Sequence, residues 1–212
     1  MTGAVDLADL TDIYRDLHAH PELAFAEHRT AAIVAGRLRD LGYQTTAGVG
    51  GTGVVGLLAN GDGPTVLLRA DMDALPVLER TGLDYASADR GKSADGTDVP
   101  VMHACGHDAH VTCLLGAAAA LAADAGSWSG TLLLVFQPAE EVGEGAQAMI
   151  DDGLFDRFGV PDVVLGQHVA PIPAGLLGVR AGAAFATTDS LRIVLHGQGA
   201  TGPGRRPRWT RC

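Results

Sequence analysis

The feature that most constrains the fold of this chain is a set of three apolar runs, each followed closely by residues that can bind a metal or move a proton. The runs, all of strand length, cover residues 65–70, 130–137 and 162–167. The residues that follow them are Asp71 and Asp73, Glu140 and Glu141, and His168. In open α/β sheets the ligand site lies beyond the carboxyl ends of the strands. The pattern therefore predicts an α/β fold in which one end of the sheet carries a polar site.

Residues 102–110, MHACGHDAH, add one thiol and three imidazoles. Cys105 and His107 are separated by one glycine, so in an extended turn both side chains can point the same way and bind one ion. Taken alone, such a triplet is also typical of a buried cysteine and surface histidines at a helix start. Together with the residues at the strand ends, it supplies N, O and S donors for one ion and nearly enough for two. The combination predicts a metal-dependent hydrolase.

The adjacent carboxylates Glu140 and Glu141 follow an apolar run. Because they repel each other, placing both at a buried strand end is costly unless cations or a shared proton offset the charge. One carboxylate of such a pair can bind a metal while its neighbour takes a proton from water. Asp71 and Asp73 face the same side of an extended chain, although such a pair is also typical of a helix N-cap or a solvated loop.

Apolar spacing predicts three helices. Amphipathic patterns cover residues 5–17 and 27–41, and Gly42 supplies a stop for the second. Residues 111–125 are rich in Ala and Leu and apolar all round, so we expect this helix to be buried with Cys113 in the core.

Strand and loop signals cover other segments. Residues 54–59 and 65–70 flank the turn Asn-Gly-Asp-Gly-Pro, which predicts a pair of strands. Residues 82–100 are polar and predict a loop. We expect three further histidines to be surface or capping residues, not ligands: His18, His20 and His28.

Composition restricts the class of protein. The 212 residues are 47% hydrophobic, 19% charged and 5% aromatic, which suits a soluble α/β domain with a core of small aliphatic side chains. The net charge of −10 argues against a nucleic-acid partner, and no window has the apolar length of a membrane span. Three cysteines and the absence of a signal pattern predict a reducing compartment, the cytoplasm.

Five motifs carry a resemblance to a known family: RDLHAHPELAFAE, RADMDALPV, MHACGHDAH, FQPAEEVGEGA and GQHVAP. In order and spacing they resemble the hippurate hydrolase and N-acyl-amino-acid amidohydrolase family of di-metal peptidases and amidohydrolases. The resemblance implies a three-layer α/β/α sandwich with an inserted α+β lid and dimerisation domain. It implies two divalent ions, Mn²⁺ or Zn²⁺, and homodimers or homotetramers formed through the lid. The implied reaction is hydrolysis of an N-acyl amino acid; a related di-metal aminopeptidase or dipeptidase would differ only in substrate.

The resemblance also implies roles for single residues. The implied metal ligands are Cys105, His107, Glu141 and His168. Glu140 is the implied base that takes a proton from water and returns it to the leaving amine, and Asp73 supports the metal site from behind. Asp71 is a weaker match that we do not take as a ligand. His103 and His110 match the motif but not its ligand positions. Because a thiolate is among the ligands, we expect zinc or manganese ahead of calcium or magnesium.

The end of the sequence departs from the family. We expect residues 1–183 to form the N-terminal part of an incomplete catalytic domain, with a strand at 176–180. Residues 184–200 would begin the lid, with a strand at 190–196, and 201–212 would be an aberrant, disordered tail carrying a reactive Cys212. By the same resemblance we expect this chain to lack the rest of the lid and a returning segment with a last metal-binding histidine.

We expect that a frameshift accounts for the departure. Where the family has Gly-His-Gly followed by Pro, this chain has the sequence GATGPGR over residues 199–205. Codons for His-Gly-Ser-Arg-Pro, CAC GGG TCC CGG CCG, become ACG GGT CCC GGC CG when the first base is lost, which encodes the Thr-Gly-Pro-Gly-Arg of residues 201–205. We therefore expect a truncated chain that is inactive on N-acyl amino acids; the alternative is an active amidohydrolase.

Overall fold

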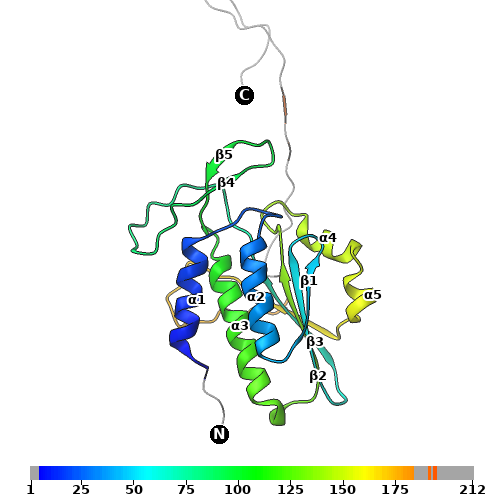
Figure 1. The fold of residues 1–212 in the computed structure, drawn as a ribbon. Coiled ribbons are helices and arrows are strands. Elements are labelled where there is room, and N and C mark those ends of the chain that lie inside the picture. The colour runs from blue at the N-terminus through cyan, green and yellow to red at the C-terminus, as the bar shows by residue number, and fades with distance from the viewer. Residues whose placement is uncertain (1–4, 184–190, 192, 195–212) are drawn as a thin grey trace, which may run out of the picture. The chain divides into compact units, whose positions relative to one another are not determined.

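The computed structural model describes residues 5–183, 191, 193 and 194 (Figure 1). The chain divides into two units, residues 1–171 and 172–212. All the helices and strands of the described part belong to the first unit, and none of these helices is long and apolar enough to cross a membrane.

A five-stranded mixed sheet forms the centre of the first unit, in the order β1-β2-β6-β3-β7. Its strands are β1 (Gln44–Val49), β2 (Gly53–Asn60), β3 (Thr65–Asp71), β6 (Gly130–Gln137) and β7 (Val163–Gly166). β6 pairs antiparallel with β2 and parallel with β3, and β7 pairs parallel with β3. The carboxyl ends of β6, β3 and β7 therefore lie at the same end of the sheet.

Helices cover both faces of the sheet (Figure 1). The helices α1 (Leu7–Ala19), α2 (His28–Asp40) and α3 (His107–Ala123) pack on one face, and α4 (Gly145–Asp151) and α5 (Leu154–Phe158) on the other. Strand β6 joins the two cores, because alternate side chains of a strand point to opposite faces. Leu132, Leu134 and Phe136 pack beneath α1–α3, while Leu133 and Val135 pack against α4 and α5. The predicted α/β/α sandwich and its buried central strand are confirmed.

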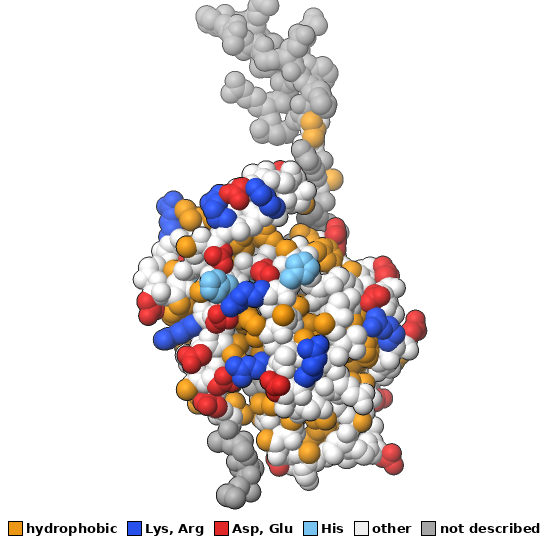
Figure 2. Space-filling view, viewed as in Figure 1, with side chains coloured by type: hydrophobic (Ala, Val, Ile, Leu, Met, Phe, Trp, Pro, Cys, Tyr) orange, Lys and Arg blue, Asp and Glu red, His pale blue; other side chains and the backbone are white. Residues whose placement is uncertain are grey.

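Charged side chains of both signs are interspersed over the face that α1, α2 and α3 present (Figure 2). Arg37 pairs with Asp9 and Arg29 pairs with Asp16, each at 2.7 Å, so two ion pairs link α2 to α1. Exposed pairs of this kind contribute little stability, and the packing of the apolar helix faces beneath them holds this layer in place.

The first two helices agree with the sequence patterns. Asp6 caps α1 by accepting the N–H groups of Ala8 and Asp9, at 2.9 and 3.2 Å. Gly42, just after α2, has a φ of 87°, a left-handed conformation that glycine adopts without strain.

The predicted pairing of β2 with β3 is wrong, because β6 lies between them. The turn that connects β2 to β3 surrounds the start of β6: Thr131 N–H donates to the carbonyl of Pro64 at 3.0 Å, and a side chain at Gly63 would collide with the backbone of Ser129. A local turn signal cannot reveal a strand that arrives much later in the chain. The sequence patterns also missed β1, and a short hairpin of β4 (Arg90–Lys92) and β5 (Asp98–Pro100) interrupts the predicted loop at 82–100.

The prediction that Cys113 lies in the core is wrong, since its side chain is exposed. One side of α3 is buried, with Val111, Leu115 and Ala118 in the core. Cys113 instead lines a shallow hollow together with Leu165 of the edge strand β7. The side chains of β7 are themselves exposed, so this border of the sheet is uncovered in the described part of the chain.

The second unit differs from the prediction as well. Residues 176–180 form no strand; Leu176 N–H donates to the carbonyl of Pro173 in a turn. Leu177 and Val179 are each 86% exposed, so burial of these two side chains does not stabilise an extended strand. Most of the strand predicted at 190–196 lies outside the described residues. The tail predicted at 201–212 lies wholly outside them.

Candidate active site

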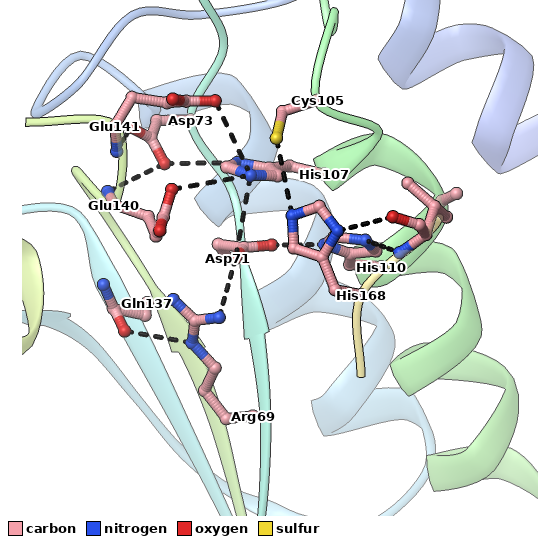
Figure 3. Close-up of polar contacts among 12 residues, drawn as sticks. Arg69, Asp71, Asp73, Cys105, His107, His110, Gln137, Glu140, Glu141 and His168 are labelled. Carbon is pink, nitrogen blue, oxygen red and sulfur yellow. Dashed lines mark hydrogen bonds and ion pairs between the residues drawn. The ribbon is translucent and has the colours of Figure 1, made fainter. Parts of the chain in front are cut away.

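The candidate site lies at the carboxyl ends of β3, β6 and β7 (Figure 3). Asp71 ends β3 directly opposite Gln137, which ends β6, so the residues that follow these two strands emerge side by side. The structure brings all six predicted site residues into this region: Asp73, Cys105, His107, Glu140, Glu141 and His168.

His107 is at the centre of the site. Its side chain is completely buried, yet neither ring nitrogen has a hydrogen-bond partner among the described residues. Nδ1 lies 3.4 Å from an oxygen of Asp73, and Nε2 lies 3.7, 3.7 and 3.8 Å from oxygens of Asp71, Glu140 and Glu141. A buried imidazole surrounded by carboxylates at these distances leaves space for a shared cation, which would offset the cost of burying the charges.

Three sets of side chains can each place one ligand atom within 4.8 Å of the others. They are Cys105, His107 and His168; Asp71, His107 and His110; and His107, Glu140 and Glu141. In the first set the sulfur of Cys105 is 3.4 Å from Nε2 of His168. His107 is common to all three sets, and the mixture of sulfur, nitrogen and oxygen donors suits divalent transition metals. The residues present therefore fit a metal centre.

The surroundings of Cys105 and Glu141 favour the binding of a positive charge. Burial, followed by the carboxylates of Glu141 and Glu140, raises the pKa of the Cys105 thiol to about 11. Burial also raises the pKa of Glu141, and the carboxylates of Glu140 and Asp73 add to this while His107 opposes it. A divalent cation beside these groups would reverse both effects and stabilise the thiolate.

Asp73 holds the backbone of the two glutamates. Its oxygens accept the N–H groups of Glu140 and Glu141, at 2.9 and 3.0 Å. Burial raises its pKa, but the nearby imidazole of His107 and the hydrogen bonds from these two amides outweigh burial and bring the pKa below its usual value. Asp73 is thus an ionised carboxylate already engaged by the backbone of its neighbours.

Asp71 is engaged by side chains that the sequence patterns did not connect to it. Nδ1 of His110 lies 2.5 Å from one oxygen, and Arg69 donates to the other at 2.7 Å. Although burial alone would raise the pKa of Asp71, these contacts lower it to about 2. Nε2 of His110 in turn accepts the N–H of Val169 at 2.9 Å. His110 therefore ties Asp71 to the segment that carries His168.

Gly106 determines how Cys105 and His107 approach the site. The sequence predicted an extended turn here, but Gly106 has a φ of 80° and precedes the first residue of α3. A Cβ at this position would collide with the side chain of Val169. The left-handed turn is the local geometry that lets the loop pack against the end of β7, and only glycine adopts it without strain.

Three histidines were predicted to be surface or capping residues, and His18 is the one of them that is buried. Its side chain is buried, with Nδ1 2.6 Å from Asp108 and Nε2 3.1 Å from Glu79, so the surface prediction is wrong for this residue. The reason is that Asp108, in the first turn of α3, requires a buried partner. His20 and His28 are not buried, and His20 pairs with an exposed Asp89.

His103 is also buried, and neither ring nitrogen has a partner among the described residues. Burial lowers its pKa to about 4, so the imidazole is neutral near pH 7. It belongs to none of the sets of ligand atoms found in the described part of the chain.

Comparison with known proteins identifies the family. The sequence profile of Peptidase family M20/M25/M40 matches residues 67–203. The chain belongs to this family. It is a family of metal-dependent hydrolases, as the five sequence motifs implied, and the family resemblance is confirmed.

Relatives in this family differ in substrate. The chain is 44% identical over 198 residues to thermostable carboxypeptidase 1 of Saccharolobus solfataricus. The match covers 91% of this chain and 47% of that protein. It is 44% identical over 192 residues to hippurate hydrolase of Campylobacter jejuni, covering 90% of the chain and 47% of the relative. The chain thus spans about half the length of these relatives.

A solved structure supports the fold. The Bacillus subtilis protein YXEP, described as a dinuclear metal binding peptidase of the M20 family, superposes with a TM-score of 0.68 at 35% identity. The match covers 77% of this chain and 43% of that chain.

Proposed function

We propose that the complete protein hydrolyses N-acyl amino acids that carry an apolar, hippurate-like acyl group. The observation that carries this proposal is a hollow of about 490 Å³ that adjoins Glu141. Eight of the twelve residues that line it are apolar, and the other four are polar or charged: Leu23, Ala24, Phe25, Ala74, Leu75, Pro76, Ala94 and Val142, with Lys92, Ser93, Glu141 and Glu144. Its volume is in the range of small-molecule sites. An apolar acyl group bound there would bring its carbonyl to the polar site.

We assign the metal ligands as the sequence motifs imply: Cys105, His107, Glu141 and His168. Two divalent ions, Mn²⁺ or Zn²⁺, would polarise the substrate carbonyl and acidify water. The exposure of the two glutamates supports a division of roles. The side chain of Glu141 is 18% exposed and that of Glu140 is 39% exposed. The more enclosed Glu141 suits a ligand, and the more open Glu140 can reach both water and substrate.

The proposed steps involve few residues of the chain. A carboxylate oxygen of Glu140 takes a proton from water and later returns it to the leaving amine nitrogen. Asp73 accepts the backbone N–H groups of Glu140 and Glu141. His110 accepts the backbone N–H of Val169, the residue directly after His168. These contacts fix the orientation of the reacting groups. We expect this orientation to lower the activation free energy by more than the hydrogen bonds contribute to stability.

A carboxypeptidase activity is a second candidate, because of the 44% identity to a thermostable carboxypeptidase. Both reactions release an amino acid from an acyl group, but the acyl groups differ, so a panel of substrates separates the two activities. Hippurate, N-acetylglycine, an N-blocked dipeptide and a free dipeptide would be compared by kcat/KM. We expect kcat/KM for hippurate to exceed that for N-acetylglycine. A higher kcat/KM for the N-blocked dipeptide than for hippurate would favour the carboxypeptidase, and cleavage of the free dipeptide alone would reject the proposal in favour of a dipeptidase.

We also propose that the 212-residue chain by itself turns over little substrate, and that the complete protein is a cytoplasmic dimer or tetramer. The uncovered β7 and the span of about half the relatives' length support the proposal on activity. Assaying the chain beside a version whose reading frame is restored near codon 200 tests it. Equal turnover by both forms would contradict it.

A further inference from the structure

The motif HPELAFAE ends in Glu27, whose side chain is completely buried and takes no part in the site described above. Glu27 has no ion-pair partner in the part of the chain that the structure describes. Its oxygens instead accept three hydrogen bonds. Oε1 accepts the N–H of Phe25 at 3.0 Å and the N–H of Ala139 at 2.8 Å, while Oε2 accepts from the hydroxyl of Thr52. A buried carboxylate without a cation is costly, so its position requires an explanation.

The two amides that share Oε1 belong to residues in the left-handed region. Phe25 has a φ of 59° and Ala139 a φ of 49°, and they are the only non-glycine residues with positive φ in the described part of the chain. An L-residue with a side chain pays a steric cost there. Such a conformation persists when surrounding contacts hold it, and it is frequent at functional sites. Here a single carboxylate oxygen contacts both strained residues.

Ala139 lies directly between the end of β6 and the two glutamates of the site. The amide of Ala139 is held by Glu27, and the next two amides, of Glu140 and Glu141, are held by Asp73. Three successive N–H groups are thus fixed by two buried carboxylates from other segments. The turn at Ala139 sets the direction in which both glutamate side chains leave the backbone.

We infer that Glu27 is a positioning residue for the metal site: by holding the left-handed turn at Ala139, it aims Glu140 and Glu141 at His107. The same oxygen holds Phe25, which lines the apolar hollow, so Glu27 also links the substrate pocket to the glutamates. This inference rests on the proposed roles of Glu140 and Glu141. It gives the N-terminal motif a function at the site without contact with metal or substrate.

The test compares two replacements of Glu27 in the 212-residue chain, with Co²⁺ alone as the probe. Glu27→Met keeps the approximate volume but removes both acceptors, whereas Glu27→Gln keeps Oε1 as an acceptor for the two amides. Co²⁺ affinity is measured by competition with a chelating indicator, and the visible spectrum of bound Co²⁺ reports the ligand geometry. We expect Glu27→Met to weaken Co²⁺ binding by about 10–100-fold and to change the spectrum, as loss of outer ligand support does. Glu27→Gln is expected to retain most of the affinity.

Glu22→Met is the matched control. Glu22 lies in the same loop and accepts two backbone N–H groups, from Arg29 and Thr30, at 2.9 and 2.8 Å. It has no hydrogen bond to residues 138–141 in the described structure, so its loss should lower stability but leave the Co²⁺ spectrum unchanged.

Two outcomes are distinct. If the unmodified chain binds no Co²⁺, the proposed metal site fails. If it binds Co²⁺ and Glu27→Met binds equally well with the same spectrum, the role of Glu27 is overturned. If Glu27→Met does not fold, Glu27→Asp provides the same test, because it shortens the side chain by one methylene and withdraws the carboxylate from the two amides. Unchanged Co²⁺ affinity and an unchanged spectrum in Glu27→Asp would again contradict the inference.

Discussion

At the scale of single residues, Glu140 and Glu141 are neighbours in the chain with different surroundings. Both face Nε2 of His107, but Glu140 is the more exposed. We predict that Glu140→Gln in the frame-restored protein lowers kcat on hippurate by about 10²–10⁴-fold, the usual effect of removing a positioned acid or base. Metal content, measured by elemental analysis, should stay unchanged.

The matched variant is Glu141→Gln. We expect it to lose metal as well as activity, because Glu141 is proposed as a ligand. If Glu140→Gln loses the metal and Glu141→Gln keeps it, the two roles are exchanged.

The cysteines offer a second comparison at this scale. Cys105 is 3.4 Å from His168 in the candidate site, whereas Cys113 is exposed on α3. We predict that Cys105→Ala weakens Zn²⁺ binding strongly and that Cys113→Ala leaves it unchanged, since only Cys105 can offer a thiolate to the ion. Titration of both variants with Zn²⁺ against a chelating indicator checks this. Equal affinities would remove Cys105 from the ligand set.

At the scale of elements, His18 connects α1 to the first turn of α3. Burial lowers its pKa, but the hydrogen bonds to Asp108 and Glu79 outweigh burial, so the pKa is raised above its ordinary value. A raised folded-state pKa stabilises the fold below the unfolded-state pKa, and this stabilisation is lost as pH rises through the folded-state value.

We therefore predict that His18→Gln costs more stability at about pH 6 than at about pH 9. The free energy of unfolding of both proteins would be measured by urea denaturation at each pH. His20→Gln is the control, because His20 pairs with Asp89 at the surface. A cost for His18→Gln that is the same at both pH values would contradict a charged His18.

The elements also show what the sequence could and could not predict. The amphipathic spacing of α1 and α2 and the continuous apolar run of β6 are local signals, and the structure confirms all three. The neighbours of β6 depend on contacts between distant segments, so the turn after β2 misled the pairing. Strand β1, with the sequence QTTAGV, has too few apolar residues to be recognised by alternation.

The same distinction applies to the site. Acids and histidines that follow strands are visible in the sequence, because the carboxyl ends of parallel strands meet at one end of a sheet. The parts played by His110 and Glu27 are not visible, since each acts through backbone N–H groups 59 and 112 residues away. Periodicity and motif spacing carry no information about such contacts.

At the scale of the whole molecule, β7 leaves the border of the sheet open in the part of the chain that the structure describes. Val163, Val164 and Leu165 are 45%, 61% and 53% exposed, although they belong to a strand paired in a parallel sheet. Parallel strands are normally covered on both faces, and an uncovered apolar border favours association with other chains. The 212-residue chain should therefore self-associate through β7.

We predict that Val164→Lys reduces this self-association, because a charge on an exposed strand opposes pairing between borders. Val160→Lys is the control: Val160 is 77% exposed but precedes the strand. Sedimentation velocity over a range of protein concentrations would compare both variants with the unmodified chain. We expect Val164→Lys to shift the distribution towards monomer and Val160→Lys to leave it unchanged. An equal shift in both variants would point to net charge alone, and association would then not be localised at β7.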